Sequence, residues 1–154
     1  QPGCSNAHVF SHAGKPWLTQ YWVRRVKEQA YGGTTPELGY GGHDEDQGQM
    51  GAVSSLMAIG LFSLKGNVDT EPRYEITSPV FDEIVIELDP DYYSGETFTI
   101  RTHNNSKENM YIQKASLNGK EHNKYWFPHE VYEKGGELEI HLGPEPNKNW
   151  GVEK

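Results

Sequence analysis

Three consecutive carboxylates stand in the segment His43-Asp44-Glu45-Asp46. Like charges this close repel and raise one another's pKa, so such a cluster is typical of a metal site, a catalytic proton transfer or a helix cap. Asp is a preferred N-cap residue, and its charge suits the positive end of a helix dipole. The same position keeps a carboxylate ionised, as a general base or a metal ligand requires. Both interpretations are open for Asp44 and Asp46.

A calcium-binding loop of the EF-hand type is a further reading of this segment. Asp44-x-Asp46-x-Gly48 resembles the start of such a loop. The glycine expected at position six is Gln49, and the bidentate glutamate expected at position twelve is Ser55. The sequence therefore does not support an EF-hand.

Two histidines could form a zinc site, because His8 and His12 have the i, i+4 spacing of ligands on one helix face. Val9 occupies the place of the glutamate in the HExxH pattern. We therefore expect ordinary packing or hydrogen bonding for both histidines. Cys4 is the only cysteine, which excludes an internal disulfide and any cysteine-rich metal site.

The four tryptophans could stack on sugar rings or fill a core. We expect core burial for Trp22, Trp126 and Trp150. Trp17, which stands beside Pro16 at a predicted helix start, is the one expected near a cleft.

Length and charge restrict the class of protein. The 154 residues suffice for one domain, and a net charge of −8 disfavours both nucleic acids and anionic membranes as partners. The apolar run from residue 50 to 64 is interrupted by glycine and serine, so it predicts a buried helix rather than a membrane span. The chain begins with Gln and shows no signal peptide, so we expect a piece of a larger protein.

The two halves of the chain differ in periodicity. Residues 1–66 read as helical, with one helix over 15–31 and a second from near Gln47 to Ile59. The first helix places Leu18, Trp22 and Val26 one turn apart. Residues 67–154 read as β-rich. This order predicts an α+β fold, a two-layer arrangement in which N-terminal helices pack on a mostly antiparallel sheet.

Apolar alternation predicts four strands, near residues 84–88, 98–100, 111–117 and 138–142. Asn118-Gly119 directly after the third of these is a strong hairpin signal. Pro128 is expected to open one short helical turn. Asn104-Asn105-Ser106 fits the glycosylation pattern, which is common by chance.

Several segments, taken together, resemble the glycoside hydrolase family 92 α-mannosidases. They occur in family order and cover nearly the whole chain: 13–20 (AGKPWLTQ), 42–49 (GHDEDQGQ), 78–82 (SPVFD), 104–113 (NNSKENMYIQ), 117–119 (LNG) and 143–147 (GPEPN). The chain departs from the family where Ala52-Val53 replaces an expected Trp-Tyr pair. Gln1 likewise replaces a glutamate, which leaves a metal role for Gln1 open.

This resemblance implies a fragment of a calcium-dependent, exo-acting, inverting α-mannosidase, of α-1,2 type, that removes terminal mannose from glycans. It assigns the general-base role to Asp44 and Asp46, and substrate contact to Trp17 and His43. The general acid and most calcium ligands would lie upstream in the same polypeptide, so the isolated chain should be inactive. We expect residues 1–154 to form a single C-terminal domain of a bacterial enzyme that is periplasmic or secreted.

Two other functions are open. One is a carbohydrate-binding or interaction module without catalysis, whose sugar binding would depend on an exposed tryptophan rather than on Asp46. The other is a structural domain in which the acidic segment only caps a helix.

Overall fold

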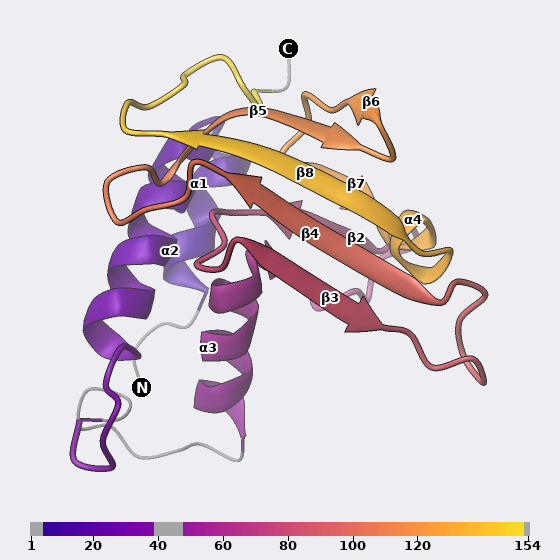
Figure 1. The fold of residues 1–154 in the computed structure, drawn as a ribbon, viewed down its shortest axis with the longest axis horizontal. Helices are drawn as coiled ribbons and strands as arrows, with labels where there is room; N and C mark the ends of the chain where they lie inside the picture. Colours follow the sequence, from indigo (N-terminus) through magenta and orange to yellow (C-terminus); the bar gives the residue numbers. More distant parts are fainter. Residues whose placement is uncertain (1–4, 39–47, 153–154) are drawn as a thin grey trace.

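The computed structural model describes residues 5–38 and 48–152 (Figure 1). Its helices come first and its strands follow, which confirms the predicted α+β fold. The helical elements of the first part are η1 (Asn6–His8), α1 (Val9–His12), α2 (Pro16–Ala30) and α3 (Gln49–Ile59). The strands are β1 (Leu61–Phe62), β2 (Arg73–Ile76), β3 (Glu83–Glu87), β4 (Thr97–His103), β5 (Tyr111–Leu117), β6 (Lys120–Glu121), β7 (Trp126–Pro128) and β8 (Gly136–Gly143), with α4 (His129–Glu133) between the last two.

Helix α2 confirms the helix predicted over 15–31, but a different face is buried. Pro16 occupies its first turn, where the missing amide hydrogen costs nothing. The buried side chains are Pro16, Thr19, Gln20 and Val23. The apolar stripe that includes Trp22 is only partly covered, and Trp22 itself is 44% exposed. The prediction that Trp22 is a core residue is therefore wrong, because polar side chains with hydrogen-bond partners take the inner face.

Helix α3 ends at Gly60, which has a positive φ of 76°. A Cβ atom at this position would lie 2.5 Å from Cγ of Pro79 and 2.8 Å from its backbone nitrogen. Glycine is therefore required both by the left-handed conformation and by the close approach of the 78–80 segment.

The larger sheet has five strands in the order β3-β4-β8-β5-β6. All neighbours in it are antiparallel except β4 and β8, which pair in parallel. The mostly antiparallel sheet is thus confirmed. The Asn118-Gly119 hairpin between β5 and β6 is also confirmed, with φ of 51° and 74°.

A second, three-stranded sheet in the order β1-β2-β7 was not predicted. Its strands have two to four residues, too few for a periodic pattern. The two sheets share one core cluster, to which Leu61, Ile76 and Phe127 contribute from the small sheet, and Phe98, Ile100 and Leu138 from the large one. The small sheet therefore covers part of the large sheet's inner face.

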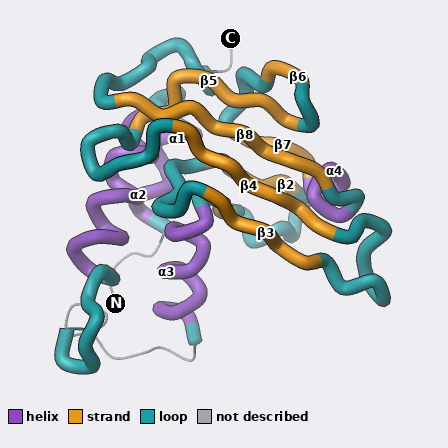
Figure 2. Tube along the Cα trace, viewed as in Figure 1, coloured by secondary structure: helices purple, strands orange, loops and turns teal. Residues whose placement is uncertain are grey.

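The helices of the first part, purple in Figure 2, lie beside the sheets and have a second core of their own. Its buried members are Ala7, Val23, Tyr31, Met50, Val53 and Met57. Within residues 5–38 and 48–152, no helix combines the length and the apolar character needed to cross a membrane.

Candidate functional site

The acidic segment joins α2 to α3, and His43, Asp44 and Asp46 lie outside the described residues. The structure instead shows what holds the two ends of this connection. The C-terminal end of α2 and the first turn of α3 lie side by side (Figure 1), and the hydroxyl of Tyr31 is 3.7 Å from Sδ of Met50. Both residues belong to the helical core. The two helices on either side of the acidic segment thus contact each other through Tyr31 and Met50.

The N-cap of α3 is Gly48, with φ of 85°. Asp46, which the sequence suggests as the cap of this helix, lies outside the described residues, so its capping role stays a prediction. Within the described part of the chain, no side chain caps α3 and no acidic residue stands in its first turn. The aligned peptide dipoles of α3 make its N-terminus the positive end of the helix dipole.

Trp17 lies in the first turn of α2, at the opposite end of the helix from Ala30. At 1.5 Å per residue the two positions are roughly 20 Å apart along the axis. The side chain is half-buried. The structure therefore does not bring Trp17 close to either α2's last turn or the start of α3.

The other tryptophans differ in environment. Trp150 is 3% exposed, and its indole Nε1 donates to the carbonyl of His122 at 3.0 Å, which confirms core burial. Trp126 is partly buried, with Arg73 and Lys124 each 4.8 Å from its ring centroid.

Polar side chains of the 13–20 segment fix α2 to its neighbours. The Thr19 hydroxyl oxygen accepts from both the amide and the hydroxyl of Ser11 at 2.9 Å. The side-chain oxygen of Gln20 accepts from the backbone amide of Ile112 in β5 at 2.9 Å. A buried strand amide thus finds its partner on a helix, which ties α2 to the large sheet.

The segment 104–106, read in sequence as a glycosylation pattern, holds the other half of α2. Arg24 donates through Nη2 to Oδ1 of Asn105 and, at 3.0 Å, to the carbonyl of Ser106. Asn105 also donates to the carbonyl of Pro79 at 3.5 Å. Sequence reasoning missed this role because the two partners are 81 positions apart.

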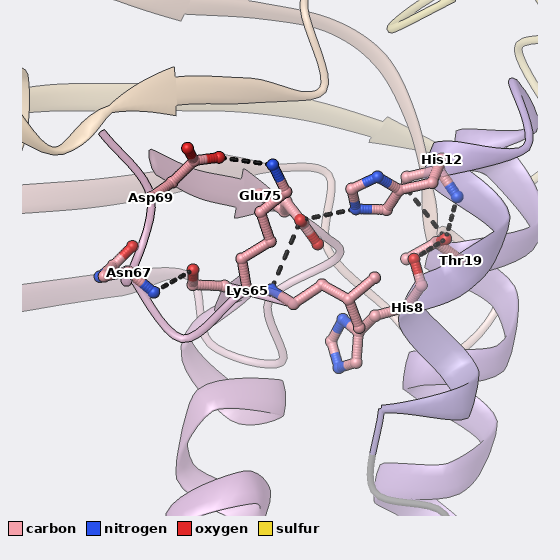
Figure 3. A network of polar contacts seen from close by, with 10 residues as sticks. His8, His12, Thr19, Lys65, Asn67, Asp69 and Glu75 are labelled. Atoms are coloured by element: carbon pink, nitrogen blue, oxygen red, sulfur yellow. Dashed lines mark hydrogen bonds and ion pairs between the residues drawn. The ribbon is translucent and has the colours of Figure 1, made fainter. Parts of the chain in front are cut away.

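A buried carboxylate connects the N-terminal helices to the small sheet (Figure 3). Glu75 of β2 is 3% exposed, and its Oε1 lies 2.8 Å from Nε2 of His12 and 3.5 Å from the amide of Leu64. The second oxygen, Oε2, is buried and has no hydrogen-bond partner in the described structure. A buried charge requires such partners, so the His12 contact stabilises the helix-to-sheet junction.

His8 packs flat on Phe62, with ring centroids 3.7 Å apart and planes 10° from parallel. Burial lowers the pKa of His8 to about 4, so the ring is neutral at pH 7. Neither ring nitrogen has a partner among the described residues. His8 and His12 therefore have separate environments, which agrees with the packing and hydrogen-bonding roles expected from sequence.

Metal-ligating side chains do not converge in the described part of the chain. Residues 5–38 and 48–152 contain no group of three His, Cys, Asp or Glu residues placed to hold a metal ion.

The sequence and the fold of this chain are similar to those of known proteins. A model of the Glycosyl hydrolase family 92 catalytic domain matches residues 1–144. A protein of the fungus Arthroderma benhamiae, described as an uncharacterized secreted glycosidase, is 36% identical over 154 residues, which are 99% of this chain and 19% of that protein.

The similar solved structures belong to the same family. An inverting mannosidase of family 92 from Bacteroides thetaiotaomicron is 32% identical with a TM-score of 0.84, covering 99% of this chain and 19% of that one. An α-mannosidase of the same family and organism, in complex with mannoimidazole, is 25% identical with a TM-score of 0.86 and the same coverage. The chain thus spans about a fifth of the length of these relatives. With a catalytic-domain match over most of its length, the chain belongs to glycosyl hydrolase family 92.

Proposed function

We propose that this chain is one part of an exo-acting, inverting α-mannosidase, of α-1,2 type, that removes terminal mannose from glycans. Its contribution to the active site is the acidic segment, with Asp46 as general base and Asp44 assisting it or positioning water. The observation that carries this proposal is the position of three carboxylates directly before α3 in a chain of family 92. The mannosidase activity of the similar solved structures supports the choice of substrate.

The electrostatics of α3 suit a base. No acidic residue stands in the first turn of α3, and the three carboxylates come shortly before this positive end of the dipole in the sequence. A neighbouring positive potential keeps a carboxylate ionised near neutral pH, in competition with the mutual repulsion of the three acids. An ionised carboxylate can take a proton from water as that water attacks the sugar.

Inversion requires two carboxyl groups on opposite faces of the sugar. One carboxylate activates water, and a protonated acid donates to the leaving oxygen. The two carboxyl groups are about 6.5–9.5 Å apart, which leaves room for the water. The proposal gives the first role to Asp46 and the second to a carboxyl group from another part of the polypeptide. The 154-residue chain alone therefore lacks half of the reaction and should not cleave mannosides.

Calcium belongs to this proposal only as a group bound elsewhere. The described residues contain no group of three His, Cys, Asp or Glu side chains placed to hold a metal ion, and the proposal assigns no step to calcium. Substrate contact by His43 and Trp17 also stays a proposal. For Trp17, its place at the far end of α2 favours a packing role. We further propose that the parent enzyme is exported, in keeping with the secreted relative.

The test is Asp46→Asn in the longer enzyme, with Glu45→Gln as the matched control. Loss of a general base should lower kcat by about 10²–10⁴-fold, while mannoside binding measured by calorimetry changes little. Glu45, which we expect to face away from the sugar, should tolerate its change. Unchanged turnover in Asp46→Asn would refute the catalytic assignment and favour a sugar-binding module without catalysis.

A further inference from the structure

A surface groove with a cavity volume of about 540 Å³ runs along the C-terminal half of α2. Its walls are α2 on one side, and residues 80–82 and 105–110 on the other. The walls are held together by the hydrogen bonds from Arg24 to Asn105 and Ser106. The groove is therefore a feature of the folded chain with fixed sides.

Part of this groove is apolar. Phe81 is 53% exposed, and Val80 and Met110 are partly buried beside it. Leaving a phenylalanine half in water forgoes much of the hydrophobic stabilisation that full burial of such a side chain provides. The groove therefore offers an apolar contact that the described residues leave unfilled.

The rest of the groove is cationic, although the chain as a whole carries a net charge of −8. Four basic residues line it, against two acidic ones, Glu28 and Asp82. The basic residues are Arg24, Arg25, Lys27 and Lys107. The groove thus has a positive balance on an acidic molecule, which favours a partner that brings carboxylates.

Arg24 lines this groove and uses only part of its hydrogen-bonding capacity. Its Nη2 is engaged, but its buried Nε has no hydrogen-bond partner in the described structure. Burial lowers the pKa of this guanidinium from its ordinary value, which shows the cost of desolvating its charge. Arg25 has a long contact of 4.0 Å to Glu28, and its side chain is 41% exposed. The exposed guanidinium of Arg25 can donate to a further carboxylate.

We propose that this groove is the docking surface for another segment of the same polypeptide, one that brings an apolar side chain onto Phe81 and a carboxylate to the arginines of α2. The occupant follows from length, because the chain spans about a fifth of relatives in which a single polypeptide continues. It also follows from the match of residues 1–144 to a catalytic domain, since the remainder of that domain needs a surface to pack on. The inference rests on the proposed function only in taking this chain as part of a longer enzyme.

Site-specific photocrosslinking in that longer enzyme tests the assignment. The photoreactive p-benzoylphenylalanine replaces Phe81 in one variant and Tyr92 in the control. Tyr92 is 83% exposed on the β3–β4 connection, away from the groove. After irradiation, mass spectrometry should find position 81 joined within the same polypeptide to a peptide outside residues 1–154. Position 92 should give no such product.

Crosslinks from position 81 that stay within residues 1–154, or that join two copies of the enzyme, would overturn the proposal. A second measurement covers the case in which the bulky probe blocks docking. Phe81→Ser should lower the Tm of the longer enzyme by several degrees, because it removes a contact buried in that context, whereas Tyr92→Ser should leave it unchanged. Equal shifts in both variants would also overturn it.

The crosslink is independent of catalysis. If Asp46→Asn keeps full turnover while position 81 still crosslinks to the rest of the enzyme, the proposed base fails and the docking surface stands. If Asp46→Asn loses turnover and position 81 does not crosslink, the reverse holds.

Discussion

The buried imidazole of His8 predicts a specific loss of stability in mild acid. Its ring is 0% exposed, stacked on Phe62, and its pKa is about 4 instead of the ordinary 6.5. Well above pH 6.5 the ring is neutral in both the folded and the unfolded chain. The contribution of the His8 ring to the free energy of unfolding is then fully present. Between pH 6.5 and 4 the unfolded chain binds a proton that the folded chain does not, and stability falls. Below about pH 4 the loss is complete.

The size of the effect follows from the shift. The fall in pKa from 6.5 to about 4 corresponds to roughly 3 kcal/mol. At pH 5 the unfolded chain is almost fully protonated at this ring and the folded chain is not, so about 2 kcal/mol of that amount should already be lost.

Urea unfolding of the wild type and His8→Phe, at pH 7.5 and pH 5, isolates this contribution. Phenylalanine keeps a flat ring over Phe62 but cannot bind a proton. For each protein the free energy of unfolding at pH 5 is compared with its own value at pH 7.5. The effect of the substitution on packing is present at both pH values and therefore cancels. The wild type should lose about 2 kcal/mol more than the variant between the two pH values. Equal losses in the two proteins would refute the reasoning, because the carboxylates that also titrate are common to both.

Three further predictions concern the scaffold and the metal. Gly60→Ala should reduce the free energy of unfolding by about 2 kcal/mol or more, because it adds left-handed strain and a contact with Pro79. Gly14→Ala is the control, with φ of 70° and no atom near the added carbon, and equal losses in chemical denaturation would contradict the role of the contact. Asn105→Ala should cost about 1–3 kcal/mol in the same assay because a partner of the half-buried Arg24 is lost, and a cost below about 0.5 kcal/mol would count against that role. In the longer enzyme, a calcium chelator should abolish mannoside hydrolysis reversibly without changing the Tm of the 154-residue chain, whereas full activity in the chelator would remove calcium from the proposal.

The elements that sequence predicted well are those whose signals are local. Pro16 begins α2, Gly60 ends α3, and Asn118-Gly119 turns the β5–β6 hairpin, each within a few residues of the feature that it sets. The long strands also carry enough alternating positions to be read. Backbone conformation in these places depends on neighbours in the chain, so a linear pattern suffices.

The features that sequence missed depend on distant partners. The parallel pairing of β4 with β8 and the whole three-stranded sheet join segments with no periodic signal of their own. The inner face of α2 was mistaken for the same reason, because Thr19 and Gln20 are buried by virtue of partners on α1 and β5. An apolar stripe predicts the buried face only when the polar residues beside it have no such partners.

By itself, the sequence determined the fold class, the long elements and the family, because these rest on local conformational preferences and on motifs in a set order. Tertiary structure alone decided that Glu75 meets His12 and that Arg24 meets Asn105 across 81 positions. It also decided that a cationic groove with an exposed phenylalanine lies beside α2. Remote segments must come together before side chains are buried, pKa values shift or hydrogen-bond donors are left without partners. These properties of the folded chain underlie the docking surface that we propose.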